Sequence, residues 1–77
     1  MANYHLKCNA PKFEQHRAYP YNKKGQELAI RDFLSLQRQF EDKWYFFKVF
    51  FRNNPLRGTI QVEIDGFYYY VELYKEL

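Results

Sequence analysis

The segment TIQVEIDGFYYYVELY, residues 59–74, constrains the fold more than any other part of the chain. Asp65-Gly66 stands between two runs of alternating apolar residues, and both residues tolerate the positive φ of a type I′ turn. Because a two-residue turn sets the register, the pairing can be compared with the hydrophobic pattern. One face of the hairpin then holds the apolar or small pairs Ile64–Phe67, Val62–Tyr69, Ile60–Val71 and Gly58–Leu73. The other face holds Glu63–Tyr68, Gln61–Tyr70, Thr59–Glu72 and Arg57–Tyr74. Turn chemistry and alternation agree, so we predict an antiparallel hairpin.

A second periodic segment, QELAIRDFLSLQRQFEDKW, predicts one amphipathic helix over residues 26–43. Its apolar residues recur at helical spacing and form one stripe: Ala29, Ile30, Phe33, Leu36 and Phe40. Either Gly25 or Asn22 could supply the N-cap, and Glu27 in the first turn would suit the positive end of the helix dipole. We expect this stripe to pack on a sheet.

The remaining segments are predicted from alternation and from loop-forming residues. Tyr4, Leu6 and Cys8 alternate in a strand that ends by Pro11. Residues 11–25 have no periodicity and many polar groups, which predicts a long basic loop. Residues 44–52, WYFFKVFFR, predict a strand that a short loop connects to the hairpin. The expected fold is a single small α+β domain over residues 1–77, with an N-terminal strand, a long loop and one helix packed on a three- to four-stranded antiparallel sheet whose meander spans residues 44–74.

Cysteine content and charge narrow the class of protein. Cys8 is the only cysteine among 77 residues, so an internal disulfide is excluded and a cytoplasmic protein is favoured. No apolar run approaches the roughly 18 residues of a transmembrane helix. The net charge of +3 comes from the N-terminal third, which holds Lys7, Lys12, Arg17, Lys23 and Lys24 against Glu14. Residues 44–77 are electrically balanced, which does not favour phosphate binding there.

No motif for catalysis or for a cofactor is present. Ser35 is the only serine and lies within the predicted helix, and the three glycines form no phosphate-binding loop. His5, Cys8 and His16 offer soft ligands, but a closed zinc site needs four. His5 and Cys8 should also point to opposite faces of a strand, because their separation is odd. We therefore interpret Cys8 as a small buried side chain and expect no enzyme, no cofactor and no metal.

Aromatic residues make up 22% of the chain, and their placement on the predicted sheet indicates a binding surface. On the helix side, Tyr45, Phe47, Val49 and Phe51 are expected to join the apolar face of the hairpin, Phe67 included. The opposite face has no second helix to cover it, and a monomer seldom leaves so large an apolar patch in water. The predicted partner-binding residues are Trp44, Phe46, Lys48, Phe50, Arg52, Arg57, Tyr68, Tyr70, Glu72 and Tyr74.

Three interpretations of this second face remain open. The N-terminal segment, with Phe13, Tyr19 and Tyr21, could fold over it. It could instead bind a partner protein or a second copy of the chain as a homodimer. It could also stack the bases of single-stranded nucleic acid, aided by the basic N-terminal segment. We expect a small non-catalytic protein-binding module, a modulator or inhibitor of a partner protein such as phages and mobile elements encode. Single-stranded nucleic-acid binding is the alternative, and neither a membrane nor a small-molecule substrate is expected.

Overall fold

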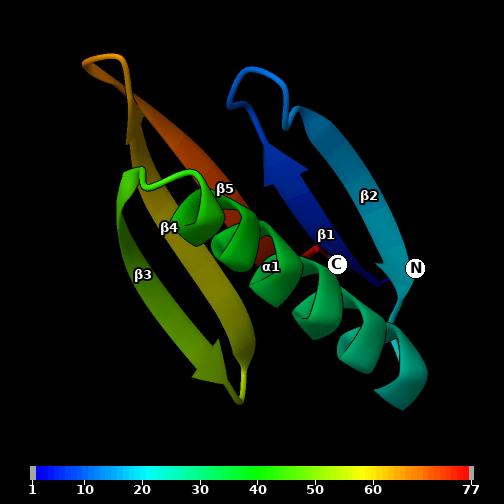
Figure 1. Cartoon of the computed structure of the whole chain (residues 1–77). Helices are drawn as coiled ribbons and strands as arrows, with labels where there is room; N and C mark the ends of the chain where they lie inside the picture. Colours follow the sequence, from blue (N-terminus) through cyan, green and yellow to red (C-terminus); the bar gives the residue numbers. More distant parts are fainter. Residues whose placement is uncertain (1, 77) are drawn as a thin grey trace.

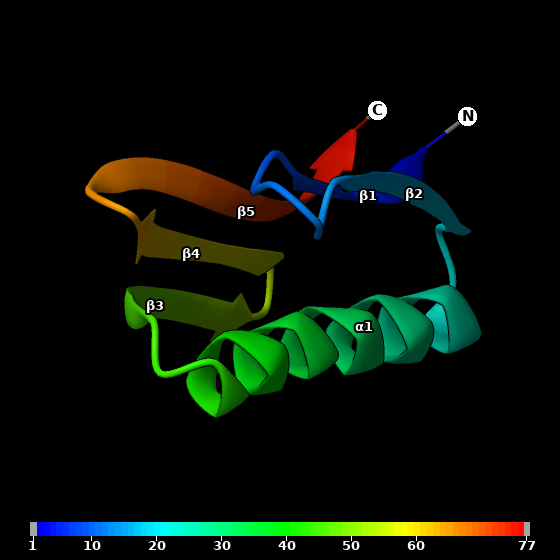
Figure 2. The ribbon, with the colours of Figure 1, turned by 45° about the horizontal axis from the view of Figure 1, so that its top comes forward.

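The computed structural model describes residues 2–76 and contains five strands and one helix (Figure 1). In chain order the elements are β1 (Asn3–Cys8), β2 (Gln15–Pro20), α1 (Lys23–Asp42), β3 (Phe46–Asn53), β4 (Leu56–Ile64) and β5 (Phe67–Glu76). The strands form one antiparallel sheet in the order β2-β1-β5-β4-β3. α1 lies along one face of this sheet (Figure 2). The predicted α+β class is therefore confirmed.

The hairpin of β4 and β5 forms in the predicted register. Asp65 and Gly66 have φ values of 53° and 83°, as a type I′ turn requires. Ile64 lies opposite Phe67, and the pairing continues as predicted to Gly58 opposite Leu73. β5 also pairs with β1 on its other side, so the last of the five strands lies at the centre of the sheet.

The sheet has five strands rather than three or four, because the predicted loop over residues 11–25 contains β2. β2 runs antiparallel to β1, with Tyr19 opposite Tyr4. Tyr19 is the one buried residue of β2, since an edge strand leaves most of its side chains in water. Its hydroxyl donates a hydrogen bond of 2.6 Å to Asp32 Oδ2 on α1. A strand held by one tyrosine and a polar contact shows no apolar alternation, which explains the wrong prediction.

α1 begins at Lys23 rather than at residue 26. Asn22 is the N-cap, and its Oδ1 accepts a hydrogen bond of 2.8 Å from the backbone N–H of Gly25. Gly25 lies inside the first turn, where a Cβ would stand 1.9 Å from the carbonyl oxygen of Pro20. Glu27 falls beyond the first turn, which carries no acidic residue, so the predicted dipole contact does not form.

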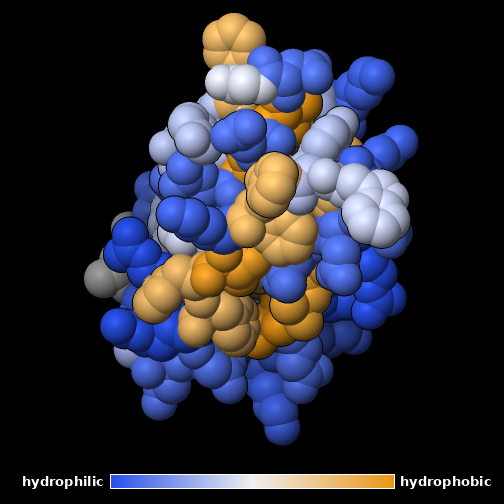
Figure 3. Space-filling view, turned by 60° about the vertical axis from the view of Figure 1, so that its left-hand side comes forward, coloured by the Kyte–Doolittle hydropathy of each residue, from blue (hydrophilic) through white to orange (hydrophobic). Residues whose placement is uncertain are grey.

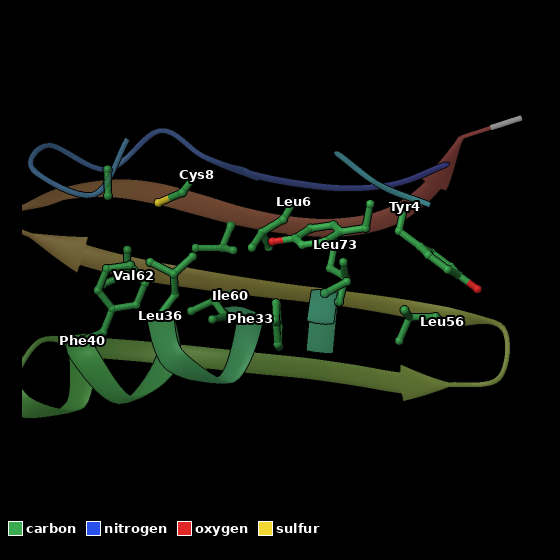
Figure 4. Close-up of a cluster of buried hydrophobic side chains, with 14 of the residues drawn as sticks. Tyr4, Leu6, Cys8, Phe33, Leu36, Phe40, Leu56, Ile60, Val62 and Leu73 are labelled. Atoms are coloured by element: carbon green, nitrogen blue, oxygen red, sulfur yellow. The ribbon is translucent and has the colours of Figure 1, made fainter. Parts of the chain in front are cut away.

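The core lies between α1 and the covered face of the sheet (Figure 4). Phe33, Leu36 and Phe40 of α1 point towards apolar side chains from the central strands. Those strand residues are Leu6, Ile60, Val62, Val71 and Leu73, and all are buried. Cys8 is buried in the same core, as predicted.

Gly58 permits a close approach between α1 and β4. A Cβ built on Gly58 would lie 2.7 Å from Cζ of the buried Phe33 ring. The ring of Phe51 on β3, opposite Gly58, lies 5.8 Å from the Phe33 ring. The absence of a side chain at position 58 thus lets one phenylalanine ring stand directly on the sheet.

Candidate functional site

The face of the sheet opposite α1, which we call the open face, is formed by every second residue of each strand. Phe46, Lys48 and Phe50 of β3 lie opposite Glu63, Gln61 and Thr59 of β4. Those three residues in turn lie opposite Tyr68, Tyr70 and Glu72 of β5. Strand alternation places Arg52, Arg57 and Tyr74 on the same face. The structure therefore brings all the predicted binding residues together on the open face except Trp44.

The N-terminal segment does not cover the open face. The Phe13 ring packs edge-on against Phe40 of α1, with 4.9 Å between the ring centroids. Tyr19 is buried in the core on the helix side. The Tyr21 ring contacts the buried Tyr4, also on the helix side, with 5.2 Å between centroids. Over residues 2–76, this segment widens the sheet and leaves the open face in water.

The helix side of β3 is more exposed than predicted. Val49 and Phe51 are 40% and 39% exposed, and Phe67 at the hairpin tip is 67% exposed, so their predicted burial was wrong. An α-helix with its side chains is about 10–12 Å wide, whereas five strands about 4.8 Å apart span about 19 Å. One helix therefore cannot cover all five strands, and within residues 45–51 only Tyr45 and Phe47 are partly buried against the core. Figure 3 shows hydrophobic side chains gathered on the side of the molecule that carries β3.

Trp44 occupies the connection between α1 and β3 in an unusual backbone conformation. Its φ is 61°, in the left-handed region. Its N–H donates to the Glu41 carbonyl at 3.0 Å, and the Tyr45 N–H donates to the Phe40 carbonyl at 3.2 Å. These two bonds, with the Phe40 and Tyr45 rings 6.4 Å apart, form a Schellman motif at the helix end. Trp44 stands at the position where such motifs usually have glycine.

The Trp44 side chain is 92% exposed, so packing does not explain why tryptophan occupies this position. A left-handed conformation costs an L-residue about 1–2 kcal/mol. The neighbouring Phe46, the first residue of β3, is 83% exposed. Trp44, Phe46 and Tyr45 line a shallow hollow together with Glu41 and Asp42. A strained, exposed tryptophan beside an exposed phenylalanine is consistent with a surface kept for binding.

Basic side chains lie beside the aromatic ones at one end of the open face. Arg52 of β3 is directly opposite Arg57 of β4. Like charges in this position destabilise a strand pair. None of the ion pairs formed within residues 2–76 includes Arg52, Arg57 or Lys48. The Arg52 guanidinium lies 5.7 Å from the centre of the Phe50 ring. This end of the face would therefore suit a partner that brings negative charge.

The part of the open face next to β1 carries residues that the sequence pattern did not assign to it. His5 Nε2 lies 3.1 Å from Glu76 Oε2, and His5 Nδ1 lies 3.1 Å from His16 Nε2. The His5 ring stacks on Tyr74, with 5.5 Å between centroids. The Lys7 ammonium lies 5.6 Å from the Tyr74 ring, and the Tyr74 hydroxyl raises the pKa of Lys7. Tyr74 is thus held by its own chain, which distinguishes it from the freer aromatic residues.

The polar and sulfur-containing side chains form no reactive cluster within the described residues. No three His, Cys, Asp or Glu side chains of residues 2–76 lie close enough to hold a metal ion. His5 and Cys8 point to opposite faces of β1, as their odd spacing predicts. Burial raises the pKa of the Cys8 thiol, which makes it a poor nucleophile near neutral pH.

Comparisons with known proteins do not add a function to this geometry. The chain matches no protein-family model, and neither the curated proteins nor the solved structures include a significant match. Within residues 2–76, no helix combines the length and the apolar character that crossing a membrane requires. Any function has to be inferred from the surface itself.

Proposed function

We propose that this chain is a small non-catalytic module that binds a partner protein through the open face. The observation that carries the proposal is that Phe46, Phe50, Tyr68 and Tyr70 are exposed on a face that no segment of residues 2–76 covers. Aromatic side chains are enriched at the centres of protein interfaces, where they bury much apolar area. A partner that covers this face would remove several such side chains from water at once.

We infer different parts for the members of this surface. Phe46, Phe50, Tyr68 and Tyr70 form the apolar centre, and Trp44 extends it at the start of β3. Lys48, Arg52, Arg57 and Glu72 are exposed and form a charged rim. Rim charges act mainly on the association rate and on the choice of partner, whereas buried aromatic anchors hold the complex together. The module would modulate or inhibit its partner by occupying one of the partner's surfaces.

A protein partner fits the charges better than nucleic acid does, although one feature favours the second candidate. Arg52 and Arg57 lie opposite each other beside the Phe50 ring, an arrangement that could hold a phosphate while a base stacks on the ring. Glu63 and Glu72 on the same face oppose a polyanion. Single-stranded nucleic-acid binding is therefore the second candidate function.

Site-specific photo-crosslinking from Tyr70 tests the proposal. Tyr70 lies on the central strand β5, and its N–H donates to Asn9 Oδ1 at 2.9 Å, which fixes its backbone. A photoreactive phenylalanine analogue at position 70 should form adducts with another polypeptide in the cells that make the protein. The same analogue at Arg38, exposed on the outer side of α1, is the matched control. Equal adducts from both positions, or none from position 70, would contradict the proposal.

A salt titration separates the two candidate functions. Fluorescence anisotropy of a labelled single-stranded oligonucleotide should show little binding if the partner is a protein. If nucleic acid is the ligand, binding should fall steeply with salt, and Arg57→Ala should reduce the slope by about one unit. Tyr70→Ala should weaken binding to a protein partner by about 2–4 kcal/mol if it is a central anchor.

A further inference from the structure

The two edge strands of the sheet differ in how they are protected against pairing with another strand. β2 is six residues long, QHRAYP, and combines polar side chains with a proline. These are features that natural proteins use to block edge-to-edge pairing. β3 is eight residues long, FFKVFFRN, without proline and with exposed apolar side chains on both faces. Its outer edge presents unpaired backbone N–H and C=O groups.

We propose that the free edge of β3 pairs antiparallel with β3 of a second copy of this chain, in a register centred on Val49. A two-fold axis perpendicular to the sheet relates two antiparallel strands of identical sequence and keeps both open faces on the same side. Open-face residues must then lie opposite open-face residues. Only registers centred on a residue, and not between residues, satisfy this condition.

The charges of β3 select among these registers. A pair centred on Lys48 would place two lysines opposite each other, and one centred on Phe50 would place Lys48 opposite Arg52 of the second copy. Like charges directly opposite are destabilising. A pair centred on Phe51 avoids this conflict but shortens the paired segment. The register centred on Val49 avoids it and pairs residues 46–52 of both copies.

This register also covers the side chains that α1 leaves exposed. On the helix side, Phe47 of each copy lies opposite Phe51 of the other copy, so one such pair stands on either side of the central Val49 pair. Val49 and Phe51, which are 40% and 39% exposed in one chain, would thereby lose contact with water. On the open face, Lys48 lies opposite Phe50 of the second copy and Arg52 opposite Phe46. Each cation would then approach an aromatic ring, as Arg52 already does with Phe50 within one chain.

The pairing would join two five-stranded sheets into one continuous sheet and place two open faces side by side. The inference goes beyond the proposed function, because it concerns backbone pairing between two copies at the edge of β3 and not the binding of a partner protein to the open face. The dimer would still affect partner binding, since it would offer a partner two copies of the open face. Two binding events on one dimer increase the overall strength of binding without any new contact.

Sedimentation velocity of the full chain over a concentration series tests the inference, and the wild type should show the mass of two chains. Val49→Lys places two like charges on the two-fold axis and should weaken the dimer by about tenfold or more. Ala18→Lys, an exposed position on the other edge strand, is the matched control and should leave the dimer intact. Thermal melts of each variant establish that it is folded.

Cysteine substitutions test the register. In a Cys8→Ala background, Val49→Cys should form an intermolecular disulfide rapidly under mild oxidation, because opposite strand residues meet the Cα separation that a disulfide needs. Phe51→Cys should crosslink slowly, since in this register its copies lie about four residues apart along the strands. A wild type that stays monomeric, a dimer that survives Val49→Lys, or faster crosslinking at position 51 would each overturn the inference. None of these outcomes affects crosslinking from Tyr70, so the two proposals fail independently.

Discussion

Because the backbone at Trp44 is left-handed, we expect glycine at position 44 to give a more stable fold than alanine at the same position. Trp44→Gly and Trp44→Ala both remove the indole, so any contacts that it makes are lost equally from the two variants. The difference that remains is the backbone. Alanine keeps the cost of about 1–2 kcal/mol for an L-residue at a φ of 61°. Glycine avoids that cost but loses about 0.5–1 kcal/mol through its greater freedom in the unfolded chain.

Trp44→Gly should therefore be more stable than Trp44→Ala by about 0.5–1 kcal/mol. For a domain of this size the difference corresponds to about 2–8 °C in the midpoint of thermal unfolding. Circular dichroism melts of the two variants in parallel measure it. Arg38, exposed within α1, is the control position, where the order should reverse and glycine should be less stable than alanine by about 1 kcal/mol.

The refuting result is an alanine variant as stable as the glycine variant, which would mean that position 44 does not need a left-handed backbone in solution. Crosslinking from position 70 in the same two variants measures whether Trp44 contributes to partner binding. If Trp44 extends the binding surface, both variants should lower adduct formation equally, whatever their stability. A gain in folding together with a loss in binding would show that the chain keeps a strained residue for its function.

Three further predictions concern stability. Gly58→Ala should lower the free energy of unfolding by about 1–3 kcal/mol, since the alanine Cβ would lie 2.7 Å from the buried Phe33 ring. An unchanged midpoint in urea titrations would contradict this prediction. Lys24→Glu should raise the free energy of unfolding by about 0.3–1 kcal/mol at low ionic strength, because the first turn of α1 has no acidic residue to interact with the helix dipole. A gain that persists in about 1 M salt would exclude this electrostatic cause. Burial and the Asp32 carboxylate raise the pKa of Tyr19, so the unfolded chain releases this proton first and stability should fall as pH rises above about 10. Tyr19→Phe should lose less stability over that pH range, and equal alkaline slopes in thermal melts would refute the assignment.

Local signals explain which parts of the fold could be predicted from the sequence. Asp65-Gly66 determines its hairpin by turn chemistry alone, and the pairing of β4 with β5 follows from it. The stripe that includes Phe33 and Phe40 identifies α1 in the same way, because helical periodicity is a local property. From these two elements and the alternation of β3, the residues of the open face on β3, β4 and β5 follow directly.

The parts that were predicted wrongly depend on contacts between distant segments. β2 is recognisable only once Tyr19 is known to pack beside Tyr4 and to bond with Asp32 of α1. The exposure of Val49 depends on how far one helix reaches across the sheet, which no pattern within β3 reveals. Trp44 did leave a signal, because EDKWY at the helix end offers no glycine for a left-handed cap. His5 and Lys7 reach the open face only through the pairing of β1 with β5.

The central place of β5 has a consequence for the order in which the protein can assemble during synthesis. β5 leaves the ribosome after β1, β2, β3 and β4, yet it is the strand that joins β1 to β4. Until it emerges, β2-β1 and β4-β3 are two separate hairpins with no strand between them. Pairs such as Leu6 with Leu73 also make the topology dominated by contacts distant in sequence, which slows folding. The nascent chain would thus carry β3 exposed beside an unfinished sheet, a state in which unpaired strand edges favour aggregation.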